Sequence, residues 1–280
     1  MTNLNTKSKI TWCPGCFNFQ ILNGFKNFIN EEIKNGKRKE DFAIVSGIGC
    51  HGKIFDYVNL NGINALHGRV LPTAFGIKIG NPNLDIFGFS GDGDSYCEGM
   101  EHLIHAARYN SNITLLVHNN QIFALTIGQS TSTTETNYKD KINPEGNKLN
   151  PINPIKIMLS ADASFVARVF AESKQIEEIL EQTKKHKGFK FIEILQPCLI
   201  FHPDKNYKDH FYNLQNSGHD KTNFQEAFKK SLEWDYNEIK EDTKIPLGIF
   251  YQKQRETFEE KYWQLKDLVK NKNSWKDLKR

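Results

Sequence analysis

Residues 85–120 are the part of the sequence that most constrains the fold. An apolar run at 85–90 leads into Gly-Asp-Gly-Asp at 91–94, and a second apolar run at 113–118 ends at Asn119-Asn120. Between the two runs, apolar residues recur at the three- and four-residue spacing of an amphipathic helix. The order strand, helix, strand predicts two parallel strands whose polar ends face one crevice at the edge of a sheet.

Further apolar runs extend this pattern. Residues 42–46 and 190–195 are two more candidate strands, and several of the four candidates are apolar at consecutive positions, as in strands covered on both faces. A helix is predicted over Ser173–His186, with Ser173 as its N-cap and Gly188 just past its end. The alternation predicts an α/β protein with a mostly parallel sheet flanked by helices.

The chain of 280 residues divides by composition into two parts. Residues 1–215 contain all candidate strands and site motifs and are predicted to form the main domain. Residues 216–280 form a Lys/Glu-rich extension with scattered aromatic side chains, which we expect to be helical and to pack on this domain or on a partner. The segment 131–154 is polar and carries three prolines, which predicts a long loop that is functional or mobile.

Charge and hydropathy narrow the class of protein. The net charge is +4 with lysines spread along the chain, so a solvated surface is a better interpretation than a nucleic-acid-binding patch. No apolar stretch is long enough to span a membrane, and the first residues lack the apolar core of a signal peptide. We therefore expect a cytoplasmic protein whose five cysteines stay reduced and serve as metal ligands or buried thiols.

The polar strand ends have the chemistry of a diphosphate and metal site. Two glycines allow the backbone to approach a diphosphate and donate N–H groups to it. Asp92 offers a carboxylate oxygen, Asn120 an amide oxygen and Ile122 a backbone carbonyl, which together make half of an octahedron for Mg²⁺. Asp-Gly pairs also form ordinary turns. A turn alone, however, does not require Asn-Asn at the end of the next strand.

The cysteines are ambiguous when each is taken alone. Cys13 and Cys16 form Cys-Pro-Gly-Cys, which fits a redox pair, half of a zinc site or part of an iron–sulfur site. Cys50 and Cys198 lie where strands are predicted to end, close to the expected site. Cys97 is left over, and we interpret it as a small buried hydrophobic side chain.

Together these segments resemble one family. Gly-Asp-Gly followed by Asn-Asn is the signature of thiamine-diphosphate enzymes. More closely, the chain resembles the β subunits of the 2-oxoacid:ferredoxin oxidoreductases. The likeness covers roughly Trp12 to Cys198 and is carried by WCPGC, VSGIGCHGKI, LHGRVLPTAFGIKIGNPNL, GDGD, HNNQIFALTIGQ and LQPC.

The resemblance implies roles for particular residues. Those implied for Mg²⁺ are Asp92, Asn120 and the carbonyl of Ile122. Those implied for one [4Fe–4S] cluster are Cys13, Cys16, Cys50 and Cys198. Those implied for thiamine diphosphate are Ile48, Gly49, Cys50, His51, His67, Gly93, Asp94, Ala124 and Leu125. By its position alone, His67 fits a structural, hydrogen-bonded histidine equally well.

The resemblance also implies a reaction and its partners. It is the oxidative decarboxylation of a 2-oxoacid to CO₂ and acyl-coenzyme A, with electrons passing singly through the cluster to ferredoxin. An α subunit is expected to hold the aminopyrimidine ring and to supply the activating acid, so no catalytic acid is assigned to this chain. Two alternatives remain: a thiamine-dependent decarboxylase or synthase subunit without a redox step, and a non-enzymatic module with a structural zinc site.

The sequence departs from the family pattern at three places. Phe17 follows Cys-Pro-Gly-Cys where many members have Gly, and Phe123-Ala124 replaces the common Tyr-Gly. Ile127 stands where many members carry Lys or Gly, which leaves the anchor of the substrate carboxylate or coenzyme A open. The substrate is therefore open among pyruvate, 2-oxoglutarate and branched or aromatic 2-oxoacids.

Overall fold

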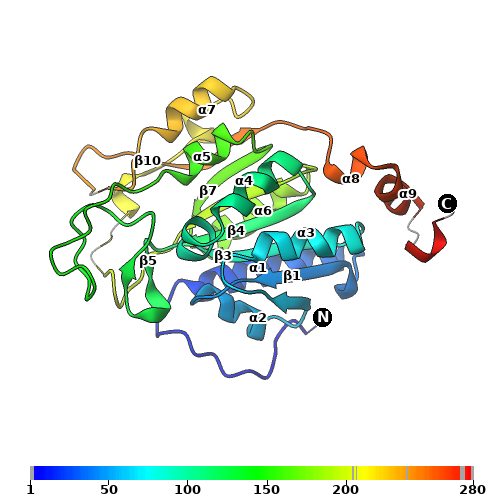
Figure 1. The fold of residues 1–280 in the computed structure, drawn as a ribbon, viewed down its shortest axis with the longest axis horizontal. Helices are drawn as coiled ribbons and strands as arrows, with labels where there is room; N and C mark the ends of the chain where they lie inside the picture. Colours follow the sequence, from blue (N-terminus) through cyan, green and yellow to red (C-terminus); the bar gives the residue numbers. More distant parts are fainter. Residues whose placement is uncertain (1–2, 204, 206, 238, 272–274, 279–280) are drawn as a thin grey trace.

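The computed structural model describes residues 3–278 except 204, 206, 238 and 272–274. Within these residues an eight-stranded sheet forms the centre of the molecule (Figure 1). Its strands lie in the order β2 (Asn61–Asn64), β1 (Phe42–Ser46), β3 (Asp85–Gly91), β4 (Ile113–Asn119), β8 (Lys190–Leu195), β7 (Phe165–Phe170), β10 (Ile245–Gln252) and β9 (Phe211–Asn213). The first six run parallel, which confirms the predicted fold class.

The four strands expected from apolar runs are all present. β1 and β8 have the predicted bounds, and β3 and β4 each continue one residue further, to Gly91 and Asn119. Every residue of β1, β4 and β8 is buried. This burial on both faces explains why the runs are apolar at consecutive positions and do not alternate.

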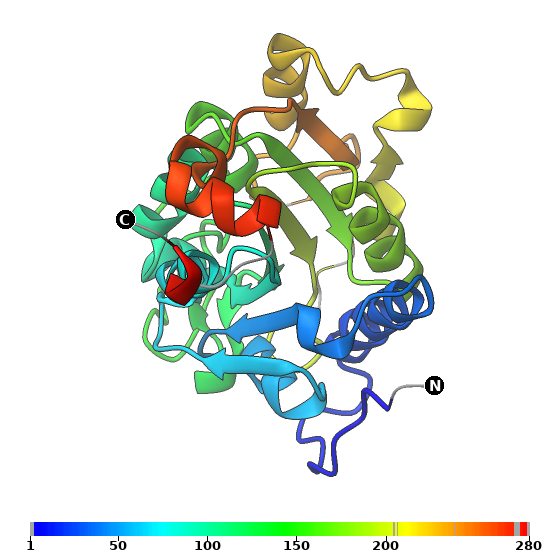
Figure 2. The same cartoon turned by 90° about the vertical axis from the view of Figure 1, so that its right-hand side faces the viewer.

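Helices cover both faces of the sheet. α1 (Asn18–Lys34) and α6 (Ser173–Thr183) lie side by side on one face, with α1 in blue in Figure 2, and pack apolar residues into one core cluster. A second cluster contains the buried apolar residues of α3 (Val70–Gly80), α4 (Met100–Tyr109) and α5 (Pro154–Ser160). The short helix α2 (Ile54–Tyr57) adds Ile54 and Tyr57 to the first cluster.

The start of α6 differs from the prediction in one detail. The N-cap is Glu172, and Ser173 is the first helical residue. The Ser173 hydroxyl donates to the backbone oxygen of Gln20 at 3.0 Å and so ties α6 to α1, because a hydroxyl next to another helix finds a tertiary acceptor. The helix ends at Thr183, before the predicted His186.

The segment 216–280 is not a purely helical extension. It contains α7 (Phe224–Ser231), α8 (Phe258–Lys261) and α9 (Trp263–Asn271), but between α7 and α8 it returns to the central sheet as β10. β10 pairs antiparallel with β7 and parallel with β9. The prediction of a helical extension is wrong for this strand, because its apolar residues are buried against β7 and complete the sheet.

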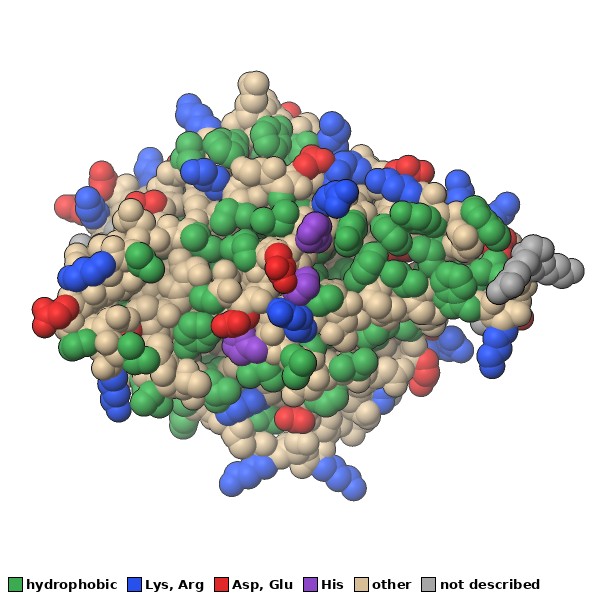
Figure 3. Space-filling model, viewed as in Figure 1, with side chains coloured by type: hydrophobic (Ala, Val, Ile, Leu, Met, Phe, Trp, Pro, Cys, Tyr) green, Lys and Arg blue, Asp and Glu red, His purple; other side chains and the backbone are tan. Residues whose placement is uncertain are grey.

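The last helices form an arm that packs on the same chain. Leu265 and Leu268 are buried, Asn83 donates to the backbone oxygen of Leu268 at 3.2 Å, and the Trp275 indole donates to that of Ile79 at 2.9 Å. Apolar side chains gather on the part of the surface where this arm lies (Figure 3), and the arm residue Trp263 is 62% exposed. Among the described residues, no helix is long and apolar enough to cross a bilayer.

Candidate functional site

A cavity opens where β1, β3 and β4 end at one edge of the sheet, and we call it the strand-end cavity. It is lined by Ile48, Gly49, Cys50, His51, His67, Gly91, Asp92, Gly93, Asp94, His118, Asn120, Ile122, Phe123, Ala124, Leu125, Thr126 and Gln196. Every residue predicted to bind thiamine diphosphate or Mg²⁺ is in this lining. The structure therefore brings these residues together, and their roles as ligands stay predictions.

Asp92 follows β3 and is buried, and no cationic side chain of the described residues pairs with it. Its carboxylate accepts a hydrogen bond from the Thr131 hydroxyl at 2.6 Å, and the Thr133 hydroxyl, which also lies 3.0 Å from the Asn119 oxygen, is 3.3 Å away. Burial nevertheless raises the pKa of Asp92 to about 7, because a carboxylate out of water favours its neutral form. A bound divalent cation would remove this penalty.

The donor set around Asp92 suits a hard cation. Asn120 and the backbone of Ile122 line the same cavity, and carboxylate, amide and carbonyl oxygens are ligands that Mg²⁺ accepts. Among the residues with described positions, no three His, Cys, Asp or Glu side chains surround a single point. A cation held here would therefore rely on one carboxylate and neutral oxygens, with diphosphate and water completing its shell.

Asp94 holds strand β3 and two loops together. Its carboxylate accepts from the Ser90 hydroxyl at 2.5 Å, from the Gly68 backbone at 2.7 Å and from the Ile48 backbone at 3.4 Å. Burial alone would raise the pKa of Asp94, but the hydrogen bond and charge of His51 outweigh it and lower that pKa. Because the side chain is engaged by the protein, the predicted contact of Asp94 with a diphosphate would have to come from its backbone N–H.

Two buried polar atoms of the cavity wall, His118 Nε2 and Gln196 Oε1, have no hydrogen-bond partner within the described structure. His51 Nε2 and His67 Nδ1 face the Asp94 carboxylate, at 3.4 Å and 3.5 Å. Buried polar atoms without hydrogen bonds are costly, so this wall fits a polar ligand. His118 and Gln196 were not among the predicted site residues, although both lie in segments that carry the family resemblance, HNNQIFALTIGQ and LQPC.

The loop after β1 is closely packed against itself. Gly52 is buried, and a Cβ atom at this position would lie 2.2 Å from the backbone oxygen of Gly47. That oxygen is part of the main chain and cannot turn away as a side chain can. Only glycine therefore allows this loop to carry Ile48–His51 into the cavity.

We expect Gly52→Ala to lower the free energy of unfolding by about 1–3 kcal/mol, the usual cost of overpacking. Gly76→Ala is the matched control, because a Cβ on this helical glycine of α3 meets no atom within 4 Å. The control should be neutral or stabilise by up to about 1 kcal/mol, the helix preference of Ala over Gly. Denaturant unfolding of both variants checks this, and equal stability would contradict it.

A second cavity adjoins the first, and we call it the thiol cavity. It is lined by Thr11, Trp12, Cys13, Cys16, Asn18, Cys50, Lys53, Asn120, Ala124, Gln196, Cys198, Leu199, Ile200 and Phe201. The four cysteines predicted to bind a cluster all belong to this lining, although they come from three distant parts of the chain. In a [4Fe–4S] cluster each thiolate binds a different iron, so such ligands surround a volume and not a point.

The surroundings of the thiols suit a cluster. Burial raises the pKa of Cys50 to about 11 and also raises that of Cys16, with the neighbouring thiols adding to both effects. Once they are deprotonated, the four cysteine thiolates would therefore need a cationic centre between them. N–H groups point at two sulfurs, from Asn18 to Cys16 at 3.5 Å and from the Phe201 backbone to Cys198 at 3.5 Å. Hydrogen bonds to sulfur are among the features that tune iron–sulfur sites.

The two cavities share one wall, formed by Cys50, Asn120, Ala124 and Gln196. The Trp12 indole donates to the backbone oxygen of Cys50 at 2.7 Å and so fixes this residue between them. Gly49 precedes it with a φ of 146°, a conformation that favours glycine. One short loop therefore borders both spaces.

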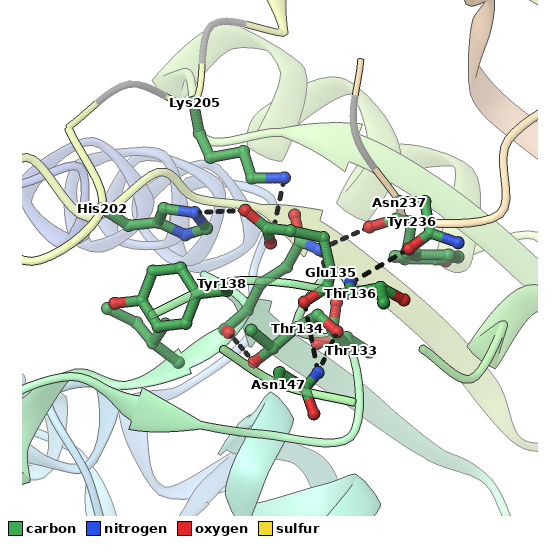
Figure 4. A network of polar contacts seen from close by, with 12 residues as sticks. Thr133, Thr134, Glu135, Thr136, Tyr138, Asn147, His202, Lys205, Tyr236 and Asn237 are labelled. Atoms are coloured by element: carbon green, nitrogen blue, oxygen red, sulfur yellow. Dashed lines mark hydrogen bonds and ion pairs between the residues drawn. The ribbon is translucent and has the colours of Figure 1, made fainter. Parts of the chain in front are cut away.

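A polar loop holds the segment that carries Cys198. Glu135 pairs with His202 at 2.9 Å and with Lys205 at 3.1 Å, as Figure 4 shows. The Tyr138 hydroxyl donates to the backbone oxygen of Phe201 at 3.0 Å. The predicted loop is thus present over residues 131–153, and α5 begins at Pro154. The loop contacts Asp92 through its threonines and the segment after Cys198 through Glu135.

Cys97 and Ile127 are both exposed. The prediction that Cys97 is buried is wrong: as the last residue of the π-helical turn Gly93–Cys97 it is exposed, and its sulfur lies 3.0 Å from the Ser132 hydroxyl. Ile127 lies between the short strands β5 (Ile122–Phe123) and β6 (Gln129–Ser130). It is 50% exposed, with a φ of 76° that is unusual for a β-branched residue.

Comparison with known proteins defines the class. The sequence model described as "Thiamine pyrophosphate enzyme, C-terminal TPP binding domain" matches residues 47–194, the part that contains most of the strand-end cavity. A second model, which describes the C-terminal region of the pyruvate ferredoxin oxidoreductase beta subunit, matches residues 202–267. The chain therefore contains a thiamine-pyrophosphate-binding domain.

Individual relatives name the family. The β subunit of a 2-oxoacid:ferredoxin oxidoreductase from Saccharolobus solfataricus is 38% identical, over 86% of this chain and 81% of the relative. The 2-oxoglutarate oxidoreductase subunit KorB of Mycobacterium tuberculosis is 37% identical, over 71% and 53%. A 2-oxoglutarate:ferredoxin oxidoreductase structure from Magnetococcus marinus matches with a TM-score of 0.85 and 29% identity, over 95% and 89%. The chain belongs to the β subunits of the 2-oxoacid:ferredoxin oxidoreductases, which confirms the resemblance.

Proposed function

We propose that this β subunit binds thiamine diphosphate and Mg²⁺ in the strand-end cavity and one [4Fe–4S] cluster in the thiol cavity. With an α subunit it would oxidatively decarboxylate a 2-oxoacid to acyl-coenzyme A and CO₂ and pass electrons through the cluster to ferredoxin. The shared wall at Cys50 is the observation that carries the proposal. A one-electron acceptor beside the organic cofactor explains oxidation in place of simple decarboxylation.

Each residue has a proposed task. Asp92, Asn120 and the Ile122 carbonyl would hold Mg²⁺, and the Ile48–His51 loop with Gly93 and Asp94 would contact the diphosphate through backbone N–H groups. His67, Ala124 and Leu125 would border the rest of the cofactor. Bound thiamine diphosphate supplies the carbanion chemistry, while the protein fixes its position and surroundings.

The four thiols of Cys13, Cys16, Cys50 and Cys198 would bind the cluster, and their N–H neighbours would tune its potential. Cluster ligands need reduced thiols, so we also place the enzyme in the cytoplasm. Neither a thiamine decarboxylase without a redox step nor a zinc module accounts for both cavities, since the first leaves the thiol cavity without a use and the second the strand-end cavity.

Membership of this family indicates a 2-oxoacid substrate and leaves the particular 2-oxoacid to be identified. The Magnetococcus marinus structure holds 2-oxoglutarate, coenzyme A and succinyl-coenzyme A. For this chain, Leu125 lines the strand-end cavity and the exposed Ile127 follows two residues later, and both side chains are apolar and uncharged. An anchor for the substrate carboxylate would therefore come from the α subunit or from another part of the rim.

The experiment is anaerobic purification of the chain with its α subunit, followed by a screen of 2-oxoacids with viologen or ferredoxin as acceptor. We expect iron and sulfide in the complex, Mg²⁺-dependent cofactor binding, and coenzyme-A-dependent reduction of the acceptor. A complex that decarboxylates without iron would favour the enzyme without a redox step. Bound zinc without thiamine diphosphate would favour the module.

The isolated chain is expected to bind thiamine diphosphate poorly and to show no turnover. The reason is that the ring-binding half of the site and the activating acid would come from the α subunit. Calorimetric titration of the chain and of the complex with the cofactor measures the difference. Full oxidation of a 2-oxoacid by the chain alone would refute the proposal that the α subunit completes the site.

A further inference from the structure

A buried ion pair lies behind the strand-end cavity. Arg168 of β7 and Glu193 of β8 approach to 2.8 Å, and their side chains are 1% and 0% exposed. The Tyr236 hydroxyl donates to the same Glu193 oxygen at 2.6 Å. Taking two charges out of water costs several kcal/mol for each ion, and such pairs rarely repay that cost in stability alone. Both groups are fixed with little freedom to move.

The ion pair determines how the next side chain is oriented. The Asn119 amide nitrogen donates to the other Glu193 oxygen at 2.8 Å. With its nitrogen committed to an anion, the Asn119 amide cannot turn over, so its oxygen must face the other way. That oxygen accepts from the Gln121 backbone at 3.0 Å and from the Thr133 hydroxyl at 3.0 Å.

Thr133 carries this chain of contacts to Asp92. Its hydroxyl oxygen lies 3.0 Å from the Asn119 oxygen and 3.3 Å from the Asp92 carboxylate. A hydroxyl has one proton, so it donates fully to only one of these acceptors. The loop that carries Thr133 runs past Tyr236 in Figure 4, and both residues are completely buried.

We propose that Glu193, Asn119 and Thr133 form a relay that positions the two side-chain oxygen ligands of the divalent cation, Asp92 and Asn120. Holding Thr133 on Asn119 leaves the Asp92 oxygen with one strong donor, Thr131, and a free direction toward the metal. This inference rests on the proposed Mg²⁺ site and adds three positioning residues to it.

The relay reaches Asn120 through the backbone. Successive side chains at the end of a strand point to opposite sides. Asn119 is 0% exposed and anchored to Glu193, while Asn120 lines the strand-end cavity. Anchoring the first asparagine therefore turns the second toward the metal site.

Thr133→Val in the αβ complex tests the relay, because valine has the same shape without the hydroxyl. Substitution of groups that orient metal ligands commonly weakens metal binding by 10–100-fold. We expect the Mg²⁺ concentration for half-maximal thiamine diphosphate binding to rise about tenfold by calorimetric titration. Thr133→Ser, which keeps the hydroxyl, should restore the parent value.

Thr183→Val is the matched control. Thr183 is also buried, and its hydroxyl donates to the backbone oxygen of Leu180 in α6, away from the cavity. It should change thermal unfolding as much as Thr133→Val does and leave the Mg²⁺ requirement unchanged. A Thr133→Val complex that needs the same Mg²⁺ as the parent, within twofold, overturns the relay.

Glu193→Gln tests the end of the relay that lies farthest from the metal site, and Glu32→Gln is its control. Glu32 is likewise buried and pairs with Lys37 at 2.7 Å and Lys184 at 2.6 Å. Only Glu193→Gln should raise the Mg²⁺ requirement, and if that variant does not fold, the Thr133 series decides alone. A parent complex that binds thiamine diphosphate without Mg²⁺ refutes the proposed metal site, which is a different result from failure of the relay.

Discussion

Replacement of Asp92 by Asn is expected to abolish Mg²⁺-dependent binding of thiamine diphosphate and, at the same time, to stabilise the metal-free protein above pH 7. The carboxylate is buried, and burial raises its pKa to about 7, whereas an unfolded Asp has a pKa of about 4. The charge is therefore a liability to the fold until a cation is bound. Asparagine keeps the shape and the oxygen that accepts from Thr131, but it loses the charge that attracts Mg²⁺.

The direction of the pH dependence follows from this shift. Below about pH 4 Asp92 is protonated in both the folded and the unfolded chain, so parent and variant should have similar stability. As the pH rises from about 4 to about 7, the parent loses stability because its unfolded state gives up the proton more readily. Melting temperatures without Mg²⁺ at pH 5 and pH 8 measure the growing difference.

Asp140→Asn is the control of opposite sign. Although burial acts to raise the pKa of Asp140, hydrogen bonds from the Asn143 backbone and from Ser130 lower it to about 2. Its charge therefore stabilises the fold above about pH 4, and that stability is lost as the pH falls toward 2. The variant should be less stable at pH 8. An Asp92→Asn protein that binds Mg²⁺ and cofactor like the parent would contradict the metal assignment.

Cys198→Ala is expected to remove the cluster and leave the thiamine site largely intact. One of four thiolates would be lost, so iron and sulfide should fall to background and viologen reduction should disappear. The strand-end cavity does not include Cys198, so Mg²⁺-dependent cofactor binding should survive. Slow decarboxylation without oxidation would then be measurable as CO₂ release.

Two further cysteine variants sharpen the result. Cys97→Ala should keep the cluster, because Cys97 lies outside the lining of the thiol cavity. Cys50→Ala should damage both cluster content and cofactor binding, since Cys50 belongs to both linings. Loss of iron from Cys97→Ala together with its retention in Cys198→Ala would show that the proposed ligand set is wrong.

A strand could be predicted from the sequence only where its own residues show the effect of burial. Four strands could be recognised because each is a continuous apolar run, which reflects burial on both faces: β1, β3, β4 and β8. β7 escaped prediction because Arg168 interrupts its run, and that charge is tolerated only beside Glu193 of another strand. β10 escaped because Pro246 and Gly248 weaken a strand pattern, and its partners β7 and β9 are distant in sequence.

The site could be predicted where the chemically important residues form short sequence motifs. Gly-Asp-Gly-Asp, Asn120 and the four cysteines all belong to the linings of the two cavities. His118 and Gln196 were missed because only folding places their polar atoms at the cavity wall. The relay through Glu193 and Thr133 was also invisible, since it depends on hydrogen bonds between residues far apart along the chain.

The wall at Cys50 also has a consequence for biosynthesis. A chain leaves the ribosome from its N-terminus, so Cys13, Cys16 and Cys50 emerge long before Cys198, which follows β8. Before β8 emerges, all the residues that line the strand-end cavity except Gln196 have been synthesised. We expect iron to be inserted only after β8 has taken its place between β4 and β7. Iron-starved cells should accordingly accumulate subunits that have a formed pocket for the organic cofactor and no electron acceptor.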